Sequence, residues 1–416
     1  MSQVECLSAG VVFLAMGSVM IRRCLSRLFL IAGMVGVGPA TAFAAEEAAG
    51  CTLAQVEVSP DSVIEPCSKI IAEKTTSPTD RGYALFIRGM GYHNTKRLDL
   101  ARQDYDDAIV LTPTNEELFV SRANIANRAG RFQEGLIFLQ KALALNPSNG
   151  HALRTMGALL DDSGYGEDAN RYFSLALAAD PKDAYALLFR SENYATQRRF
   201  DEALKDADGL VAIPPAVINR QGYLDGRGDR VDFHIVALEK RAGIYDELGQ
   251  FDRAEQDLNA AVAYSRSARS LSARGKFLAY KTGREKEALS DLDEAIALGS
   301  VDSRAYYAKA IVHSGLNDLQ DALTALDSAV EIDPWFPSAL RMRAKLHREL
   351  DQADLAAADM TQAVAGCIQA GCTAALQDTM SAMRRAGYWR SSDNPTDLTP
   401  ELKDAIRACM LDKHCN

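Results

Sequence analysis

Small and apolar residues recur along this chain with a spacing of 34 residues. Each anchor is a small residue that is usually followed by a bulky apolar residue four positions later and by alanine seven positions later. The anchors are Ala101, Gly135, Ala169, Ala203, Ala254, Ala288, Ala322 and Ala356, and only the step from Ala203 to Ala254 is longer, at 51 residues. Self-similarity at a fixed period of this size predicts units that stack on one another.

Within each unit, apolar or small residues stand three and four positions apart in two segments, which predicts two amphipathic helices joined by a short polar turn such as "NTKRLD". Twelve residues before the anchors the chain prefers another small residue, where helix backbones can approach closely, and Lys276 is the exception. Prolines just past the second helix can stop it, at Pro113, Pro147, Pro181, Pro215 and Pro334. The units ending near Arg266 and Ser300 lack this proline, so their second helices can run on.

The motif Gly89–Tyr92–Ala101–Tyr105–Ala108–Pro113 resembles the tetratricopeptide repeat family, and the resemblance covers eight units over residues 82–370. It implies an all-α fold: a right-handed α-solenoid of helix-turn-helix repeats with a concave inner groove. The residues lead to the same stacking independently, because one helix pair cannot bury its apolar face alone.

The remaining segments are predicted to frame this array. Stepping back 34 residues from Ala101 reaches Cys67, within a stretch of helical spacing that predicts a half-repeat. We expect a leader in residues 1–44, an N-terminal cap with the half-repeat in 45–81, repeats one to four in 82–217, an insertion loop in 218–234, repeats five to eight in 235–370, and a C-terminal helical cap in 371–416. In that cap, Thr399 and Pro400 predict the start of a helix that ends near Leu411.

The leader has the pattern of a secretory signal peptide. Three arginines precede an apolar run from Leu28, and Ala42-Phe43-Ala44 fits a small-x-small cleavage site. Met20 is a possible true start, and an uncleaved anchor is the alternative. We expect an exported, periplasmic protein with no stable membrane span after leader removal.

Six cysteines follow the leader, an even number that predicts disulfides in an exported chain. Cys51 is expected to bond Cys67 and to tie the N-terminus to the cap helix. Two antiparallel helices in the C-terminal cap favour the nested pairs Cys372–Cys409 and Cys367–Cys415, because the residue numbers of facing positions have a nearly constant sum. A four-cysteine zinc site is the alternative, although its spacings lie at or beyond the usual range.

Candidate chemistry is sparse. The formal net charge of −10 argues against nucleic-acid binding, and no phosphate-binding glycine loop or nucleophile elbow is present. His313 and His347 stand one period apart at a slot that holds Tyr92, Tyr194 and Tyr245 in other units. This position predicts packing rather than a metal, because neither neighbourhood supplies further ligands. We therefore predict no catalytic residue, no cofactor and no metal.

The inner face of the first helices is the candidate binding surface. Its predicted residues are Asn124, Asn127, Arg128, His151, Arg154, Asp161, Tyr185 and Glu192. Their mixed polar and aromatic character favours a protein or peptide partner. A solvated helix face without any ligand is the alternative.

These observations predict a non-enzymatic protein-binding or peptide-binding scaffold of the bacterial cell envelope. Two other functions stay open. The "GYW" stretch near residue 388 and the helix after it faintly resemble helical peptidoglycan-binding domains, and the chain is also compatible with a regulatory subunit of an envelope enzyme.

Overall fold

The computed structural model describes residues 50–221, 223–224, 230–281, 283–300, 302–370, 373–391 and 395–412. The expected leader lies outside these residues. The chain divides into two compact units, residues 1–112 and 113–416. None of the described helices is both long and apolar enough to cross a bilayer.

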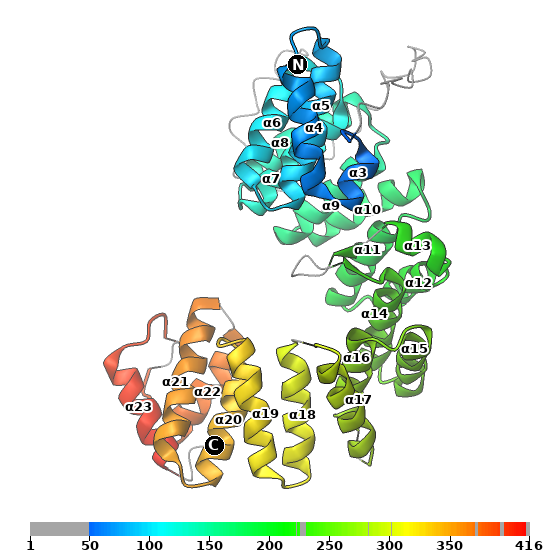
Figure 1. The fold of residues 1–416 in the computed structure, drawn as a ribbon. Coiled ribbons are helices and arrows are strands. Elements are labelled where there is room, and N and C mark those ends of the chain that lie inside the picture. The colour runs from blue at the N-terminus through cyan, green and yellow to red at the C-terminus, as the bar shows by residue number, and fades with distance from the viewer. Residues whose placement is uncertain are drawn as a thin grey trace, which may run out of the picture. The chain divides into compact units, whose positions relative to one another are not determined.

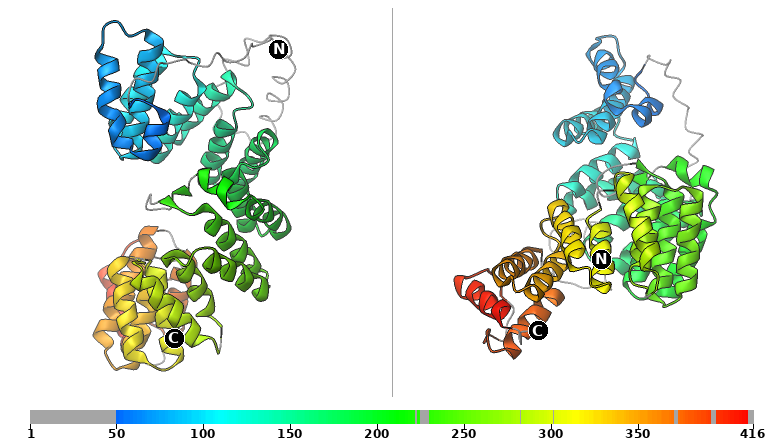
Figure 2. Two further views of the ribbon diagram at one scale, coloured as in Figure 1. Left: turned by 45° about the vertical axis from the view of Figure 1, so that its right-hand side comes forward. Right: turned by 60° about the horizontal axis from the view of Figure 1, so that its bottom comes forward.

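The fold is an all-α repeat solenoid made of antiparallel helix pairs (Figure 1). Figure 2 shows from two other sides that the helices Ser303–Gly315 and Leu319–Ile332, drawn in yellow, run side by side. The first unit contains one pair, α5 (Pro78–Asn94) with α6 (Leu98–Leu111). The second unit contains α7 (Glu116–Arg128) with α8 (Phe132–Leu145), α9 (Gly150–Asp162) with α10 (Gly166–Ala179), α11 (Ala184–Thr196) with α12 (Phe200–Val211), α14 (Phe233–Glu247) with α15 (Phe251–Tyr264), α16 (Ala268–Leu278) with α17 (Glu285–Ala297), α18 (Ser303–Gly315) with α19 (Leu319–Ile332), and α20 (Pro337–Glu349) with α21 (Ala353–Ala370).

Each helix pair turns through one residue in the left-handed conformation at the same repeat position. These residues are Lys96, Gly130, Gly164, Arg198, Gly249, Gly283, Asn317 and Asp351. Glycine adopts this conformation without steric cost, whereas the four other side chains do so at some expense. The described pairs thus keep a left-handed residue at this position even where the sequence does not favour it.

The small residues of the first helices make room for bulky residues of the second helices. A Cβ atom built on Gly89 would lie 2.6 Å from the Tyr105 ring, and one on Gly157 would lie 2.5 Å from the Phe173 ring. In the pair α16–α17 the corresponding residue is Gly275, whose Cβ would lie 2.8 Å from Leu292. The pair α16–α17 therefore has a small residue at the close contact like the other pairs, but at Gly275 and not at Lys276. The turn between these helices is longer than in the other pairs, which shifts the register.

The second helices that lack a following proline do not run on. α15 ends at Tyr264 and α17 at Ala297, close to the repeat position where the other second helices end. After α15, Ser267 and Ser270 form a capping box that starts α16. After α17, Gly299 adopts a positive φ of 89°, which turns the chain out of the helix. The expected extension is wrong because these local signals replace the proline.

A buried arginine–aspartate pair joins the two helices in five of the described pairs. Both carboxylate oxygens accept hydrogen bonds of 2.6–2.9 Å from the guanidinium in Arg88–Asp104, Arg190–Asp206, Arg241–Asp257, Arg274–Asp291 and Arg343–Asp359. The third nitrogen donates to the preceding second helix, at Ser68, Ser174, Asp208, Asn259 and Asp327. Each arginine thus ties its own helix pair to the element before it.

The segment 218–234 is not a surface loop as predicted. It begins inside α13 (Pro215–Gln221), continues through an antiparallel hairpin of β1 (Tyr223–Leu224) and β2 (Arg230–Val231), and enters α14 at Phe233. Ile218 and Phe233 are fully buried in one cluster with Leu188. The expectation failed because it treated the inserted residues as one polar stretch, whereas the apolar residues at both ends join the core.

Asn219→Ala is expected to lower the free energy of unfolding by about 1–3 kcal/mol, since it breaks three bonds at the base of the hairpin. The amide nitrogen donates to Asp232 (2.9 Å) and to the Tyr264 hydroxyl (3.2 Å), and the amide oxygen accepts from the His234 backbone (3.1 Å). Urea unfolding measures the change. Asp201→Ala, on an exposed position of α12, serves as the control. An equal effect of both variants would show that the hairpin base adds nothing.

Both ends of the array carry additional helices. At the N-terminal end, α3 (Leu53–Val58) and a 3-10 turn (Pro60–Val63) precede α4 (Ile64–Ala72), and Cys51 is disulfide-bonded to Cys67 of α4 with their Cα atoms 5.1 Å apart. At the C-terminal end, α22 (Thr373–Arg385) precedes α23 (Pro400–Leu411), whose first turn is capped by Thr399 as predicted.

The C-terminal disulfide pattern stays a prediction. Cys367 and Cys409 are both disulfide-bonded and buried in one cluster. Cys372 and Cys415 lie outside the described residues. The nested pairing is therefore untested.

Candidate protein-binding face

The eight predicted residues all lie on first helices of the second unit: Asn124, Asn127 and Arg128 on α7, His151, Arg154 and Asp161 on α9, and Tyr185 and Glu192 on α11. We call them the first-helix face. Most of them contact the next first helix along the chain, so the face is built from bonds between repeats rather than from independent side chains.

The N-terminal ends of α7 and α9 are joined through Glu117. His151 Nδ1 lies 2.8 Å from Glu117 Oε2, and the Asn149 amide donates to Glu117 Oε1 over 2.8 Å. Burial opposes ionisation of Glu117, but the bonds from His151 and Asn149 outweigh it, so the pKa of Glu117 is lowered from its usual 4.5. Glu117, which the sequence reasoning missed, is therefore the residue that joins these two repeats.

Arg154 joins α9 to α11. It donates to Asp183 Oδ2 over 2.6 Å, and its guanidinium lies 5.2 Å from the centre of the Tyr185 ring. Asp183 is at the same time the N-cap of α11, because its other oxygen accepts from the Ala186 backbone. The Tyr185 ring packs on Phe233 with centroids 5.0 Å apart. Tyr185 thus supports the core as well as the face.

An acidic spot lies where α9 ends. Asp161 accepts a hydrogen bond from the Asn193 amide, and Asp162 accepts one of 3.2 Å from the Asn127 amide. Burial, together with the charges of Asp162 and Glu192, raises the pKa of Asp161. Because amide partners are neutral, they leave the charges of both aspartates uncancelled.

The same type of contact continues beyond the predicted residues. Glu192 pairs with Lys240 of α14 over 2.5 Å, Glu239 pairs with Arg269 of α16 over 2.6 Å, and Lys276 pairs with Asp302 at the start of α18 over 2.6 Å. Burial raises the pKa of Glu239 even though Arg269 is bonded to it. The sequence reasoning missed these continuations because the partners stand 26 to 48 residues apart.

Asn124 and Arg128 complete the face. Asn124 is half-buried, and Arg128 is exposed at the end of α7. They are the positions of the predicted set at which a probe can be attached without breaking a described contact between first helices.

Stability should depend on pH through Glu117. Its folded-state pKa is lowered, so the carboxylate stabilises the fold above pH 4.5 and loses this contribution as the pH falls through the lowered value. We expect Glu117→Gln to lower Tm at pH 7 and to approach the wild type as the pH falls through the lowered pKa. The energy should stay below about 1 kcal/mol, because the pair is partly exposed. A constant Tm difference from pH 7 to pH 3 would contradict this assignment.

The residues behind the peptidoglycan-domain resemblance have packing roles. The Tyr388 hydroxyl donates to Asp412 Oδ2 over 3.0 Å, and Trp389 packs against the buried cluster of the C-terminal cap. A cleft of about 570 Å³ lies between α21 and α23, with Trp335, Thr361 and Arg407 in its wall. Nothing in its chemistry selects a particular ligand.

Comparisons with known proteins agree with the repeat pattern. Residues 155–217 and 277–335 match one tetratricopeptide repeat model, and residues 236–267 match another. Among curated proteins, the human tetratricopeptide repeat protein 6 is 26% identical over 58% of this chain and 43% of its own length. The DnaJ homolog subfamily C member 7 homolog of Schizosaccharomyces pombe is 25% identical over 43% of this chain and 37% of its own length.

The solved structures to which this chain is similar include a tetratricopeptide repeat protein from Parabacteroides merdae, with a TM-score of 0.47 and 18% sequence identity. The match covers 64% of this chain and 98% of that protein. This chain spans less than half the length of the curated relatives that it matches. The family models match segments on both sides of the insertion. Residues 155–217, 236–267 and 277–335 are therefore tetratricopeptide repeats, as the repeat pattern predicts.

Proposed function

We propose that this protein is a non-enzymatic scaffold of the bacterial cell envelope that binds a protein or peptide segment on its first-helix face. Tetratricopeptide repeat proteins are generally protein-interaction scaffolds. The observation that carries the proposal is the acidic spot of Asp161 and Asp162, whose charges meet only neutral amides among the described residues.

The spacing of the first helices suits an extended segment. Packed helices lie about 8–10 Å apart, which equals roughly three residues of an extended chain. A partner can thus present one side chain to each repeat in succession. The carboxylates that join the repeats keep lone pairs for further hydrogen bonds, because each oxygen can accept more than one. Binding therefore does not require the contacts between repeats to break.

The acidic spot selects the charge of the partner. Two uncancelled carboxylates side by side favour a lysine or arginine, and an arginine can bond a carboxylate through two nitrogens at once. We infer that the bound segment carries a basic residue where it crosses the end of α9. Binding should accordingly weaken as salt is added.

A photo-crosslinking residue at Asn124 or at Arg128 tests the face in intact cells. Both positions should capture the same partner, because both lie on α7 beside the acidic spot. The control position is Ile137 on the second helix α8, which is exposed and should capture nothing. Capture at Ile137 alone, or at none of the three positions, would contradict the proposal.

Charge removal tests the chemistry of the captured partner. The double variant Asp161→Asn and Asp162→Asn should weaken its retention by about tenfold or more, since charge-assisted hydrogen bonds to two carboxylates are lost. Asp201→Asn on α12 removes one exposed charge away from the face and should have no effect. Unchanged retention in the double variant would exclude a basic contact at this place.

The envelope location has a separate test. The proposal expects mature protein that begins near Ala45 in the periplasmic fraction, as the signal-peptide pattern indicates. N-terminal sequencing of the protein recovered from fractionated cells measures this. Soluble protein in the cytoplasmic fraction with the complete leader would exclude the envelope role and leave the binding face untouched.

A further inference from the structure

One position near the end of the first helices carries an aromatic or imidazole ring, and this ring lies beside the start of the second helix. We call this position the ring slot; its residues are Tyr92, Tyr194, Tyr245, His313 and His347. The Tyr92 ring lies 4.9 Å from the Arg97 guanidinium, and the Tyr194 ring lies 4.4 Å from that of Arg199, each measured to the ring centre. Arg97 and Arg199 hold the position just before their second helices. The slot therefore places an aromatic ring beside the side chain five residues later.

Tyr245 extends the pattern by one position. Its ring lies 5.6 Å from the guanidinium of Arg253, which stands eight residues later in the first turn of α15. Side chains five and eight residues after the ring can thus both approach it. In these repeats the approaching groups are cations, which is the favourable charge for an aromatic face.

Two repeats carry histidine in the slot, and they differ in what surrounds it. His347 Nδ1 is 2.7 Å from Gln352 Oε1, and the residue eight positions later is Leu355. This imidazole has an ordinary hydrogen-bond partner from the position five residues on. The other ring nitrogen, Nε2, lies 3.7 Å from Asp359 Oδ2, a carboxylate oxygen that already accepts a hydrogen bond from Arg343. Packing and one hydrogen bond therefore account for His347.

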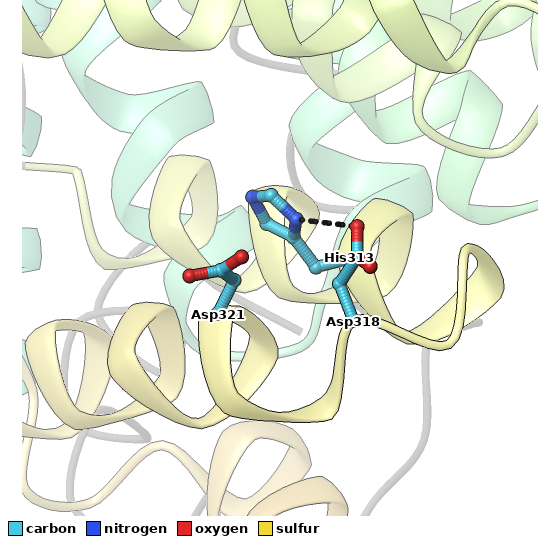
Figure 3. Close-up of side chains that lie close together, drawn as sticks. All are labelled: His313, Asp318 and Asp321. Atoms are coloured by element: carbon cyan, nitrogen blue, oxygen red, sulfur yellow. Dashed lines mark ion pairs between the residues drawn. The ribbon is translucent and has the colours of Figure 1, made fainter.

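His313 has two carboxylates instead. Asp318 and Asp321 stand five and eight residues after it, at the positions that hold Arg97 and Arg253 in other repeats. One ligand atom from each of His313, Asp318 and Asp321 lies within 4.8 Å of the others (Figure 3). The expectation that the neighbourhood of His313 supplies no further ligands is thus wrong, because the ligands come from the next helix across the turn.

The Nδ1 atom of His313 makes no hydrogen bond among the described residues. It is buried, and the nearest carboxylate oxygen, Asp318 Oδ2, lies 3.7 Å away. The whole side chain is 13% exposed. A buried polar nitrogen without a bond is costly, so a group that fills the space between it and the carboxylates would remove that cost.

Helix capping does not explain Asp318. Asp318 precedes α19, but its side chain makes no capping hydrogen bond. Its backbone angles, φ −86° and ψ 66°, match those of Arg97 at −85° and 64°, so the slot directs this side chain toward the ring rather than toward the helix. The nearby Lys309 is engaged with Asp293 over 2.6 Å and is therefore already paired elsewhere.

We propose that His313, Asp318 and Asp321 bind one divalent transition-metal ion, such as Zn²⁺. One imidazole nitrogen and two carboxylate oxygens are ligands that this class of ion accepts, with water completing the coordination on the exposed side. Tetrahedral zinc ligands lie roughly 3.3 Å apart, so small rotations of the two exposed aspartate side chains close the site. The ion would join the end of α18 to the start of α19.

Zinc titration of the full chain, after chelator treatment and without reductant, tests the site. We expect the wild type to bind one equivalent more than His313→Ala, or at least about tenfold more tightly at that equivalent. Asp321→Asn should weaken the same equivalent. His347→Ala is the matched control, because it changes the same slot one repeat later, and it should bind like the wild type.

Cobalt(II) as a second probe identifies the ligand atoms. Binding through His313 and the aspartates should give visible absorption without the strong near-ultraviolet charge-transfer band of a thiolate ligand. A thiolate band would assign the metal to cysteine. Zinc binding that is unchanged in both His313→Ala and Asp321→Asn, equal loss in His347→Ala, or binding of Mg²⁺ in place of zinc would each overturn the proposal.

Discussion

Asp257→Ala is expected to lower the free energy of unfolding by about 3–5 kcal/mol. The side chain is 7% exposed and accepts bonds of 2.8 and 2.7 Å from Arg241 Nε and Nη2. Removing it leaves a largely buried guanidinium without its main partner, which costs far more than the pair itself contributes. Urea unfolding followed by circular dichroism measures the change as a lower midpoint.

The matched control is Asp208→Ala, which removes the other partner of the same arginine. Asp208 is 56% exposed and accepts one bond of 2.8 Å from Arg241 Nη1. An exposed ion pair contributes about 0–1 kcal/mol, so this variant should stay close to the wild type. Equal losses in the two variants would mean that burial is not what makes the arginine–aspartate pair important.

The stacking of helix pairs was predictable because the signals for it are local and repeated. The anchors from Ala101 to Ala356 fix the register, and the small residues twelve positions earlier mark the close contacts. The error at Lys276 came from assuming a constant turn length. Once the longer turn before α17 is allowed, Gly275 takes the place of Gly89 and Gly157.

The spacing of the arginine–aspartate pairs can be read from the sequence, but their burial and their bonding cannot. Arg88, Arg190, Arg241 and Arg343 each precede an aspartate by 16 residues, while Arg274 precedes Asp291 by 17. Charged residues at such spacing are usually assigned to solvent, because charges are rarely buried without a partner. Only the packed helix pair shows that the guanidinium reaches across to the second helix.

The sequence predicts which residues lie on the first-helix face, but it does not predict the bonds that they make to neighbouring repeats. Periodicity places His151 and Arg154 on the correct helix face, but their partners Glu117 and Asp183 stand 34 and 29 residues away. No local pattern distinguishes a side chain that points to solvent from one that bonds the next repeat. The same limit applies to Ile218, whose burial depends on elements that precede and follow it.

The repeat period alone does not reveal the cluster at His313. It relates His313 to His347, which stands one period later along the array. The carboxylates lie across the turn instead, five and eight residues later, where the second helix folds back on the first. The signal in the sequence is therefore the pair of aspartates five and eight residues after His313, at positions that hold arginine in other repeats.

Phe173→Ala is expected to lower the free energy of unfolding by about 3–5 kcal/mol, because it empties a fully buried site. The ring packs on Phe189 with centroids 6.0 Å apart, and it fills the space that Gly157 leaves open. Phe251→Ala is the control: the side chain is of the same type but 49% exposed, and its loss should cost less than about 1 kcal/mol. Comparable losses would show that the second helices are not held by their buried rings.

The effect of Gly157→Ala on the free energy of unfolding should have opposite signs in the wild type and in the Phe173→Ala variant. In the wild type the new Cβ would lie 2.5 Å from the Phe173 ring, and overpacking of this kind costs about 1–3 kcal/mol. In the Phe173→Ala background the clash is gone, and alanine favours a helix interior over glycine by about 0.5–1 kcal/mol. The same substitution should therefore destabilise the wild type and stabilise the variant. Urea midpoints of the four proteins in this double-mutant cycle give the coupling energy, and additive effects would mean that the glycine is not there to admit the ring.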